Sequence, residues 1–208
     1  MKKYLVEFIG TFFLVLTIGS TVIVPGAGNL APLAIGAALM IMVYAGGHVS
    51  GGHYNPAVTL GVFLRGKCPA TDVLPYWIAQ LVGGILAAIV VGYFKGAGAA
   101  QAIDPDFGPA LVAEFLGTFA LVYVVLNVAT AKATAGNSYF GLAIGSTVMV
   151  MAFALGGISG GAFNPAVAFG LTVMGISAPE NIWIYLLADL AGGVGAAMIF
   201  KQTVGFED

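Results

Sequence analysis

Two segments of this sequence resemble each other and contain the same Asn-Pro-Ala tripeptide. The first reads Gly-Gly-His-Val-Ser-Gly-Gly-His-Tyr-Asn-Pro-Ala-Val over residues 46–58, and the second reads Gly-Gly-Ile-Ser-Gly-Gly-Ala-Phe-Asn-Pro-Ala-Val over residues 156–167. Asn is a favoured helix N-cap, and Pro is favoured at the first helical position because its missing N–H would be unbonded there anyway. Each segment is therefore predicted to be a glycine-rich irregular loop, beginning at Gly46 or Gly156, that leads into a helix at the Asn-Pro step.

The two helices that follow are expected to be short. They are predicted to end near Arg65 and Met174, after about ten residues, and ten residues rise about 15 Å, or half of a bilayer core. Two half-helices that enter from opposite faces meet at their N-termini, and each N-terminus carries roughly +0.5 charge. A pore between them opposes cations and protons but not a neutral solute.

The same segments supply the candidate pore groups. The Asn amides can donate hydrogen bonds, and non-helical backbone at membrane depth lines a water-filled cavity or is buried in protein. The Asn-Pro-Ala positions are Asn55, Pro56, Ala57, Asn164, Pro165 and Ala166. The pore-loop positions, whose carbonyls can accept hydrogen bonds, are Gly51, Gly52, His53, Gly160 and Ala162. A single Asn-Pro step is also compatible with an ordinary turn, but two copies in equivalent places favour the pore.

The composition places these segments in a membrane. The 208 residues are 60% hydrophobic and only 8% charged, whereas a soluble domain has about 25% charged residues. This excludes a cytoplasmic enzyme, a disordered chain and a nucleic-acid binder, which needs a basic patch. The single cysteine, Cys68, excludes a disulfide framework and a Cys-based zinc site. The 31 glycines indicate closely packed helices.

Six stretches are long and apolar enough to cross a bilayer, which needs roughly 20 residues. They are residues 4–24, 31–48, 73–94, 110–131, 139–157 and 181–201. The first is interpreted as a retained helix and not a signal peptide, because it is long and contains Glu7. With a cytoplasmic N-terminus, every Lys and Arg except Lys95 falls on the cytoplasmic side. The positive-inside rule therefore predicts that both termini are cytoplasmic.

The chain also contains an internal repeat, of residues 1–100 and 107–208. The hexapeptide Glu-Phe-Ile-Gly-Thr-Phe at Glu7 recurs as Glu-Phe-Leu-Gly-Thr-Phe at Glu114, and the Asn-Pro-Ala boxes recur in nearly the same register. Each half contains three spans, and an odd number reverses the direction of the second half. We therefore expect one all-α membrane channel domain made of an inverted repeat, with a solute path at the repeat interface.

These motifs resemble those of the aquaporins, in the major intrinsic protein family, over nearly the whole chain. The resemblance rests on the six spans, the two Glu-Phe-x-Gly-Thr-Phe starts, the stretch Gly-His-Val-Ser-Gly-Gly-His-Tyr-Asn-Pro-Ala-Val-Thr and both Asn-Pro-Ala boxes. It implies a right-handed bundle of six helices with two half-helices that meet at the midplane, a pore in each protomer and a homotetramer. It also implies passive conduction of water or small neutral solutes, with no cofactor, no metal and no enzymatic chemistry.

One position departs from the family pattern. The family usually has Arg directly after the second Asn-Pro-Ala, where this chain has Val167. The other three positions of the family's outer constriction fall on Ile35, Ala152 and Gly161, where water-selective members resemble Phe, His and a small polar residue. All four residues here are apolar and most are small, so the resemblance implies a broader filter whose polar contacts come from backbone. Passage of solutes beyond water is the resulting hypothesis.

Acidic residues and histidines inside the predicted spans and loops need separate interpretation. A carboxylate within a membrane suggests a functional role such as a proton relay, but the resemblance favours a structural role for Glu7 and Glu114 as acceptors for the pore-loop backbone. Asp189 matches Gln80 of the first half, which indicates a polar slot of unassigned role. His48 and His53 are interpreted as loop-packing residues, with a pH gate as the alternative for His53; neither has nearby partners for a metal site.

Two other function classes remain open on the sequence. Secondary transporters also use inverted repeats and broken helices, but they normally need charged or ion-coordinating groups at the midplane. A non-conducting structural membrane protein is the other alternative, and the short loops argue against it. The expected partners are water, small neutral solutes and the lipid bilayer, in a plasma or inner membrane, without nucleic acid.

Overall fold

The computed structural model describes residues 1–96 and 98–205, and this part of the chain forms eight α-helices. Six of them are long: α1 (Lys2–Val22), α2 (Ala31–Ser50), α4 (Ala70–Lys95), α5 (Phe107–Thr130), α6 (Phe140–Ser159) and α8 (Ile182–Thr203). Two are short: α3 (Pro56–Leu64) and α7 (Pro165–Val173). Three-residue 3₁₀ turns occur at Gly28–Leu30, Lys132–Thr134 and Pro179–Asn181. Residues 206–208, the end of the predicted second repeat, lie outside the described residues, as does residue 97.

The six predicted spans are confirmed, because six helices are long and apolar enough to cross a membrane. The first of them, α1, packs against α2 and α4 inside the bundle. The two predicted half-helices are also present, and they end one residue before the expected positions, with Arg65 and Met174 as their C-caps.

The start of the irregular loops was placed too early by the sequence analysis. Gly46 and Gly47 lie in the last turns of α2, and Gly156 and Gly157 lie in the last turns of α6. The helices end instead at the next glycines, Gly51 and Gly160, whose φ angles of 91° and 95° are left-handed. Glycine adopts this conformation without a steric penalty and commonly terminates a helix. The non-helical segments are therefore only residues 51–54 and 160–163.

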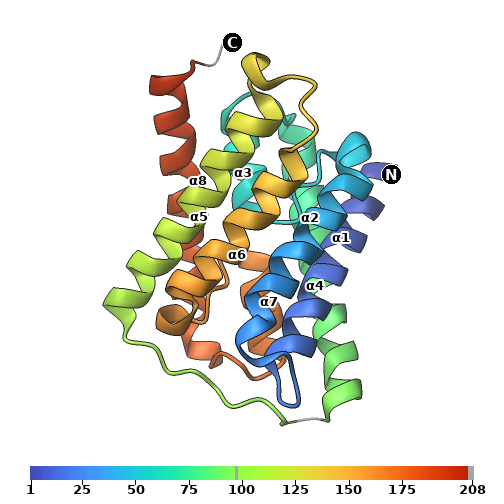
Figure 1. The fold of residues 1–208 in the computed structure, drawn as a ribbon, viewed down its shortest axis with the longest axis vertical. Helices are drawn as coiled ribbons and strands as arrows, with labels where there is room; N and C mark the ends of the chain where they lie inside the picture. Colours follow the sequence, from blue (N-terminus) through green and yellow to red (C-terminus); the bar gives the residue numbers. More distant parts are fainter. Residues whose placement is uncertain (97, 206–208) are drawn as a thin grey trace.

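The long helices run side by side in one bundle, and α1 begins at the same end of the bundle at which α8 finishes (Figure 1). The most extensive contacts join α1 to α4, α5 to α8 and α2 to α6. The half-helices lie inside this frame. Each one packs against the last long helix of the other half, α3 against α8 and α7 against α4. This exchange fixes the two half-helices relative to each other.

Glycines allow the long helices to approach backbone to backbone. A Cβ atom added to Gly83 of α4 would lie 2.5 Å from the carbonyl oxygen of Phe8 in α1. The equivalent atom on Gly192 of α8 would lie 2.7 Å from the carbonyl oxygen of Phe115 in α5. Close approach of this kind is how helices associate in lipid, where no hydrophobic effect drives them together. The high glycine content is thus explained in part by helix packing.

The outside of the bundle is apolar. Large side chains such as Leu74, Ile89 and Leu187 expose more than half of their surface, whereas the buried interior includes Glu7, Gln80 and other polar residues. A soluble protein rarely exposes apolar patches of such extent. The arrangement suits a protein surrounded by lipid.

Two glycines of α4 provide a matched test of this packing. The substitution Gly83→Ala is expected to lower the free energy of unfolding by about 1–3 kcal/mol, because the new methyl group meets backbone that has to move. Gly92→Ala, in the same helix, adds a methyl group with no atom within 4 Å and should leave stability unchanged or raise it by up to about 1 kcal/mol through helix propensity. Thermal unfolding of the detergent-solubilised variants measures both effects. Equal loss in the two variants would contradict the close contact.

Candidate functional site

The N-termini of the two half-helices face each other in the interior of the bundle. Asn55 caps α3, and its side-chain oxygen accepts a hydrogen bond of 2.8 Å from the N–H of Ala57. Asn164 caps α7 in the same way, with a bond of 2.9 Å from the N–H of Ala166. The caps use the amide oxygens, so the amide nitrogens remain as donors.

These amide nitrogens join the two halves. Asn55 Nδ2 donates to the carbonyl oxygen of Phe163 at 2.8 Å, and Asn164 Nδ2 donates to that of Tyr54 at 2.9 Å. Each amide thereby uses one of its two hydrogens and keeps the second for another acceptor. The carbonyls of Tyr54 and Phe163 each accept one hydrogen bond in this exchange.

Two aromatic residues before the Asn-Pro steps have an unusual backbone. Tyr54 and Phe163 have φ angles of 50° and 49°, which is uncommon for a bulky residue and marks a position held by its surroundings. Both side chains are 1% exposed, and the Tyr54 hydroxyl donates to the carbonyl oxygen of Met42 at 2.9 Å. The sequence analysis assigned no role to either residue. The sequence did offer a signal for these two residues, because both directly precede an Asn-Pro box, at equivalent positions of the repeat.

Glu7 holds the first loop from within α1. Its carboxylate accepts hydrogen bonds from the backbone N–H groups of His53 and Tyr54, at 3.0 Å and 2.6 Å, and from the hydroxyl of Ser50 at 2.6 Å. The Gln80 amide adds a fourth donor at 2.8 Å. Glu7 is completely buried, and these donors are what makes a buried carboxylate tolerable.

Glu114 holds the second loop in the same geometry. Its carboxylate accepts from the backbone N–H groups of Ala162 and Phe163, at 3.0 Å and 2.6 Å, and from the hydroxyl of Ser159 at 2.5 Å. The serine was missed by the sequence analysis in both halves, although Ser50 and Ser159 stand in equivalent places of the repeat.

A cavity of about 210 Å³ lies beside the half-helix N-termini and extends along the second loop. It brings together both capping residues, Asn55 and Asn164, and the four positions of the expected filter, Ile35, Ala152, Gly161 and Val167. Its other walls are mostly aliphatic side chains, among them Ile18, Leu39 and Val148. Among the described residues, no Asp, Glu, Lys or Arg lines it.

The loop residues predicted to offer carbonyls also border this cavity. Gly52, His53, Gly160 and Ala162 line it, whereas Gly51 lines a second cavity. The first cavity is thus lined both by loop residues, which can offer polar backbone groups, and by aliphatic side chains.

The second cavity has about 240 Å³ and lies on the other side of the first loop. His53 lines both cavities, so the two spaces adjoin at this residue. His53 is 8% exposed, and its Nδ1 is 3.1 Å from the hydroxyl oxygen of Thr59. Within the described residues, no cluster of His, Cys, Asp and Glu is suited to a metal ion. His53 thus contacts Thr59 of α3, while His48 lies in α2.

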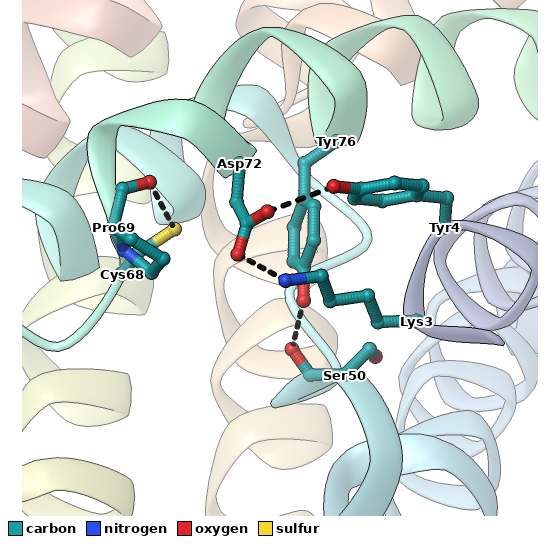
Figure 2. A network of polar contacts seen from close by, with 7 residues as sticks. All are labelled: Lys3, Tyr4, Ser50, Cys68, Pro69, Asp72 and Tyr76. Atoms are coloured by element: carbon teal, nitrogen blue, oxygen red, sulfur yellow. Dashed lines mark hydrogen bonds and ion pairs between the residues drawn. The ribbon is translucent and has the colours of Figure 1, made fainter. Parts of the chain in front are cut away.

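Several residues that line the second cavity belong to a network of polar contacts (Figure 2). Asp72, at the start of α4, accepts hydrogen bonds from the side chains of Lys3 and Tyr4 in α1. Tyr76 donates from its hydroxyl to the carbonyl oxygen of Ser50 at 2.7 Å, which ties α4 to the end of α2. Cys68 lies beside this group and lines the cavity. Burial raises the pKa of the Cys68 thiol above its ordinary value.

Comparisons with known proteins agree with this geometry. The family model described as major intrinsic protein matches residues 1–200. The chain is 37% identical to the Glycerol uptake facilitator protein-like 6 of Lactiplantibacillus plantarum, with all of both chains covered. It is 34% identical to Aquaporin AqpM of Methanothermobacter thermautotrophicus, with 96% of each chain covered. It is 35% identical to Aquaporin NIP1-4 of Oryza sativa, over 97% of this chain and 76% of that protein.

A solved structure has the same fold. The aquaglyceroporin from Plasmodium falciparum superposes with a TM-score of 0.79, at 21% sequence identity, over 98% of this chain and 96% of that one. The inverted-repeat fold with six spans and two half-helices is thereby confirmed. From the family model, these relatives and the fold, the chain belongs to the major intrinsic protein family and is an integral membrane channel protein.

Proposed function

We propose that this channel conducts water and small uncharged polar solutes, of which glycerol is the model, without coupling to an ion or to a chemical reaction. The observation that carries this proposal is the first cavity, which joins both capping Asn residues to the four filter positions and has no Asp, Glu, Lys or Arg in its described wall. The name of the Lactiplantibacillus plantarum relative supports glycerol as a solute.

The route runs through both cavities. A solute enters the first cavity at the filter, passes Asn55 and Asn164, and leaves through the second cavity past His53. The free amide hydrogens of the Asn pair and the loop carbonyls replace hydrogen bonds to water along one wall. The aliphatic wall contacts the carbon backbone of a polyol. Passage along this route needs no nucleophile or cofactor, so in this proposal the protein conducts its solutes without changing them chemically.

Val167 sets the width and polarity of the outer filter in this proposal. Its side chain is 2% exposed and directly follows the second Asn-Pro-Ala box, at the first turn of α7. With Ile35, Ala152 and Gly161 it forms a ring without a cationic donor. A wider, less polar opening accepts a three-carbon polyol, and the hydrogen bonds there come from the backbone of residues 160–162.

Ions are excluded by the half-helices. Both N-termini point to the middle of the route, and each contributes roughly +0.5 charge that opposes cations. An anion has to give up its hydration in a passage lined largely by carbon, which is costly. A coupled transporter would need ion-binding groups at this point, and the capping Asn residues have apolar neighbours there instead.

We further propose an assembly and an orientation. The unit is one channel domain, residues 1–208, built from repeats 1–100 and 107–208, and four copies form a homotetramer. The apolar outer faces of the helices supply the surfaces for contact with lipid and with other copies. Both termini face the cytoplasm of a plasma or inner membrane, since this places every Lys and Arg except Lys95 on the cytoplasmic side.

Glycerol uptake by proteoliposomes tests the filter. Val167→Arg adds a long cationic side chain to the ring and is expected to reduce glycerol flux about tenfold, equivalent to ~1.4 kcal/mol of barrier, with a smaller effect on water flux. Val167→Met lengthens the side chain without adding a charge. It therefore separates the effect of a narrower filter on flux from the effect of the positive charge. Light scattering after an osmotic step measures both fluxes. A wild-type channel that passes water alone, with Val167→Arg unchanged, would contradict the proposed filter.

The single cysteine tests the second half of the route. A small neutral methanethiosulfonate reagent attached to Cys68 places extra atoms in the second cavity and should reduce water and glycerol flux together. Because burial raises the pKa of this thiol, less thiolate is present at neutral pH, and the rate of modification should increase as the pH rises. The Cys68→Ala variant is the control and should conduct without sensitivity to the reagent. Complete labelling, checked by mass spectrometry, with unchanged flux would exclude this route.

A further inference from the structure

The two halves support their pore loops with different residues at one equivalent position. In the first half, Gln80 of α4 donates its amide to Glu7 at 2.8 Å and to the hydroxyl of Thr59 at 3.0 Å. In the second half, the position of Gln80 is occupied by Asp189 of α8, beside Glu114. A neutral donor is thus replaced by a second carboxyl group.

Asp189 is completely buried and has few donors. Its Oδ1 accepts a hydrogen bond of 2.9 Å from the hydroxyl of Thr118, and the backbone N–H of Asn164 also interacts with the carboxyl group. The remaining oxygen, Oδ2, is buried without a donor. At the same time, Asp189 stands where the first half has Gln80, which contacts Glu7 directly, and it interacts with Glu114 across the packed helices α5 and α8. Two ionised carboxylates offer only acceptors, so a hydrogen bond between them requires a proton.

In the part of the chain that the structure describes, the helices packed against α8 contain no Lys or Arg to balance two carboxylates. The helices packed against α8 are α5, α3 and α7, and their titratable residues are Glu114 and Tyr123. On α8 itself they are Tyr185, which donates to the carbonyl oxygen of Ser159, and Lys201, about 18 Å along the helix. The charged residues that flank these helices lie near the ends of α8, away from Asp189. Arg65, after α3, stacks on Phe200 near the end of α8, and Glu180, before α8, is exposed.

We propose that Glu114 and Asp189 together bind one proton, and that this proton makes the hydrogen bond that the Gln80 amide makes in the first half. Two adjacent buried carboxyl groups without a cation cannot both ionise without a large free-energy penalty. Glu114 accepts three hydrogen bonds, from Ser159, Ala162 and Phe163, which favour its charged form. The proton therefore resides on Asp189, and Oδ2 donates it to Glu114.

This arrangement makes Asp189 a positioning residue for the second pore loop. It fixes Glu114, which holds the backbone N–H groups of Ala162 and Phe163, and this loop carries Gly161 of the filter. Loss of the shared proton leaves two repelling charges behind the loop, so the loop geometry depends on protonation. In the first half the equivalent contact is made by the side-chain amide of Gln80, which does not titrate.

Infrared difference spectroscopy of the purified protein in lipid tests the proposal directly. A buried protonated carboxyl group has a carbonyl stretch distinct from that of a carboxylate, and we expect this band at neutral pH in the wild-type protein. Asp189→Asn keeps a donor toward Glu114 and should remove the band, because Glu114 is then the ionised acceptor of an amide. Absence of the band from the wild-type protein overturns the proposal. The readout does not depend on which solutes the channel passes.

Two further variants keep the test decisive. Gln80→Glu places a second carboxyl group beside Glu7 and should add a band of the same kind, in a protein that retains the original pair. Thr118→Val removes the hydroxyl that binds Asp189 Oδ1 and should shift the frequency of the wild-type band, since the band belongs to Asp189. A wild-type band that is unaltered in both Asp189→Asn and Thr118→Val arises elsewhere and overturns the assignment.

Conduction provides the second readout. Flux through the wild-type channel should decrease at alkaline pH, as the pair loses its proton, whereas flux through Asp189→Asn should stay level over the same range. A purely structural polar contact would give both proteins the same pH profile. Identical profiles, with the infrared band present, would show that the proton does not position the loop.

Discussion

The structure depends on one constraint, which is that backbone N–H groups at membrane depth need hydrogen-bond acceptors when they are not in a helix. Residues 51–54 and 160–163 break the helical pattern between two spans in each half. Glu7 and Glu114 meet this requirement, because each carboxylate accepts from two loop N–H groups and from the serine at the end of the preceding helix. These hydrogen bonds hold both loops in place beside the first cavity, which residues of both loops line.

The exchange of hydrogen bonds between the halves follows from this support. Once each loop is fixed, Asn55 and Asn164 cap their own helices and also reach the carbonyl of the opposite loop. A displacement of either loop would break a cap and a link together. The half-helices are further held by the opposite half, through α4 and α8. The centre of the bundle is therefore held by contacts from both halves, whereas the positions proposed for the filter come from α2, α6, the second loop and α7.

Much of this was predictable from the sequence, and the reasons are specific. The Asn-Pro step indicates a helix start because Asn caps a helix and Pro suits its first position. The six spans follow from the length of the apolar stretches. The internal repeat provides a second, independent copy of each motif. The loop boundaries were placed too early because glycine tolerates both helix and turn, and only the backbone geometry separates Gly47 from Gly51. The serines at the ends of α2 and α6 and the aromatic residues of the loops were missed because their roles depend on which distant carboxylate or carbonyl they contact. The bonding of Asp189 was equally out of reach, since it requires knowing what lies opposite Oδ2.

The two departures of the second half, Val167 and Asp189, have a common electrostatic consequence. In the proposed outer filter, Val167 stands where the family usually has a cation, so that the exclusion of cations is left to the half-helix N-termini. Two ionised carboxylates behind the second loop would weaken that positive potential at close range, through a medium of low dielectric. A proton shared by Glu114 and Asp189 keeps one negative charge behind this loop in place of two. In the proposed channel, a protonated carboxyl pair therefore supports the exclusion of cations by the half-helices, and this connects the roles proposed for Val167 and Asp189.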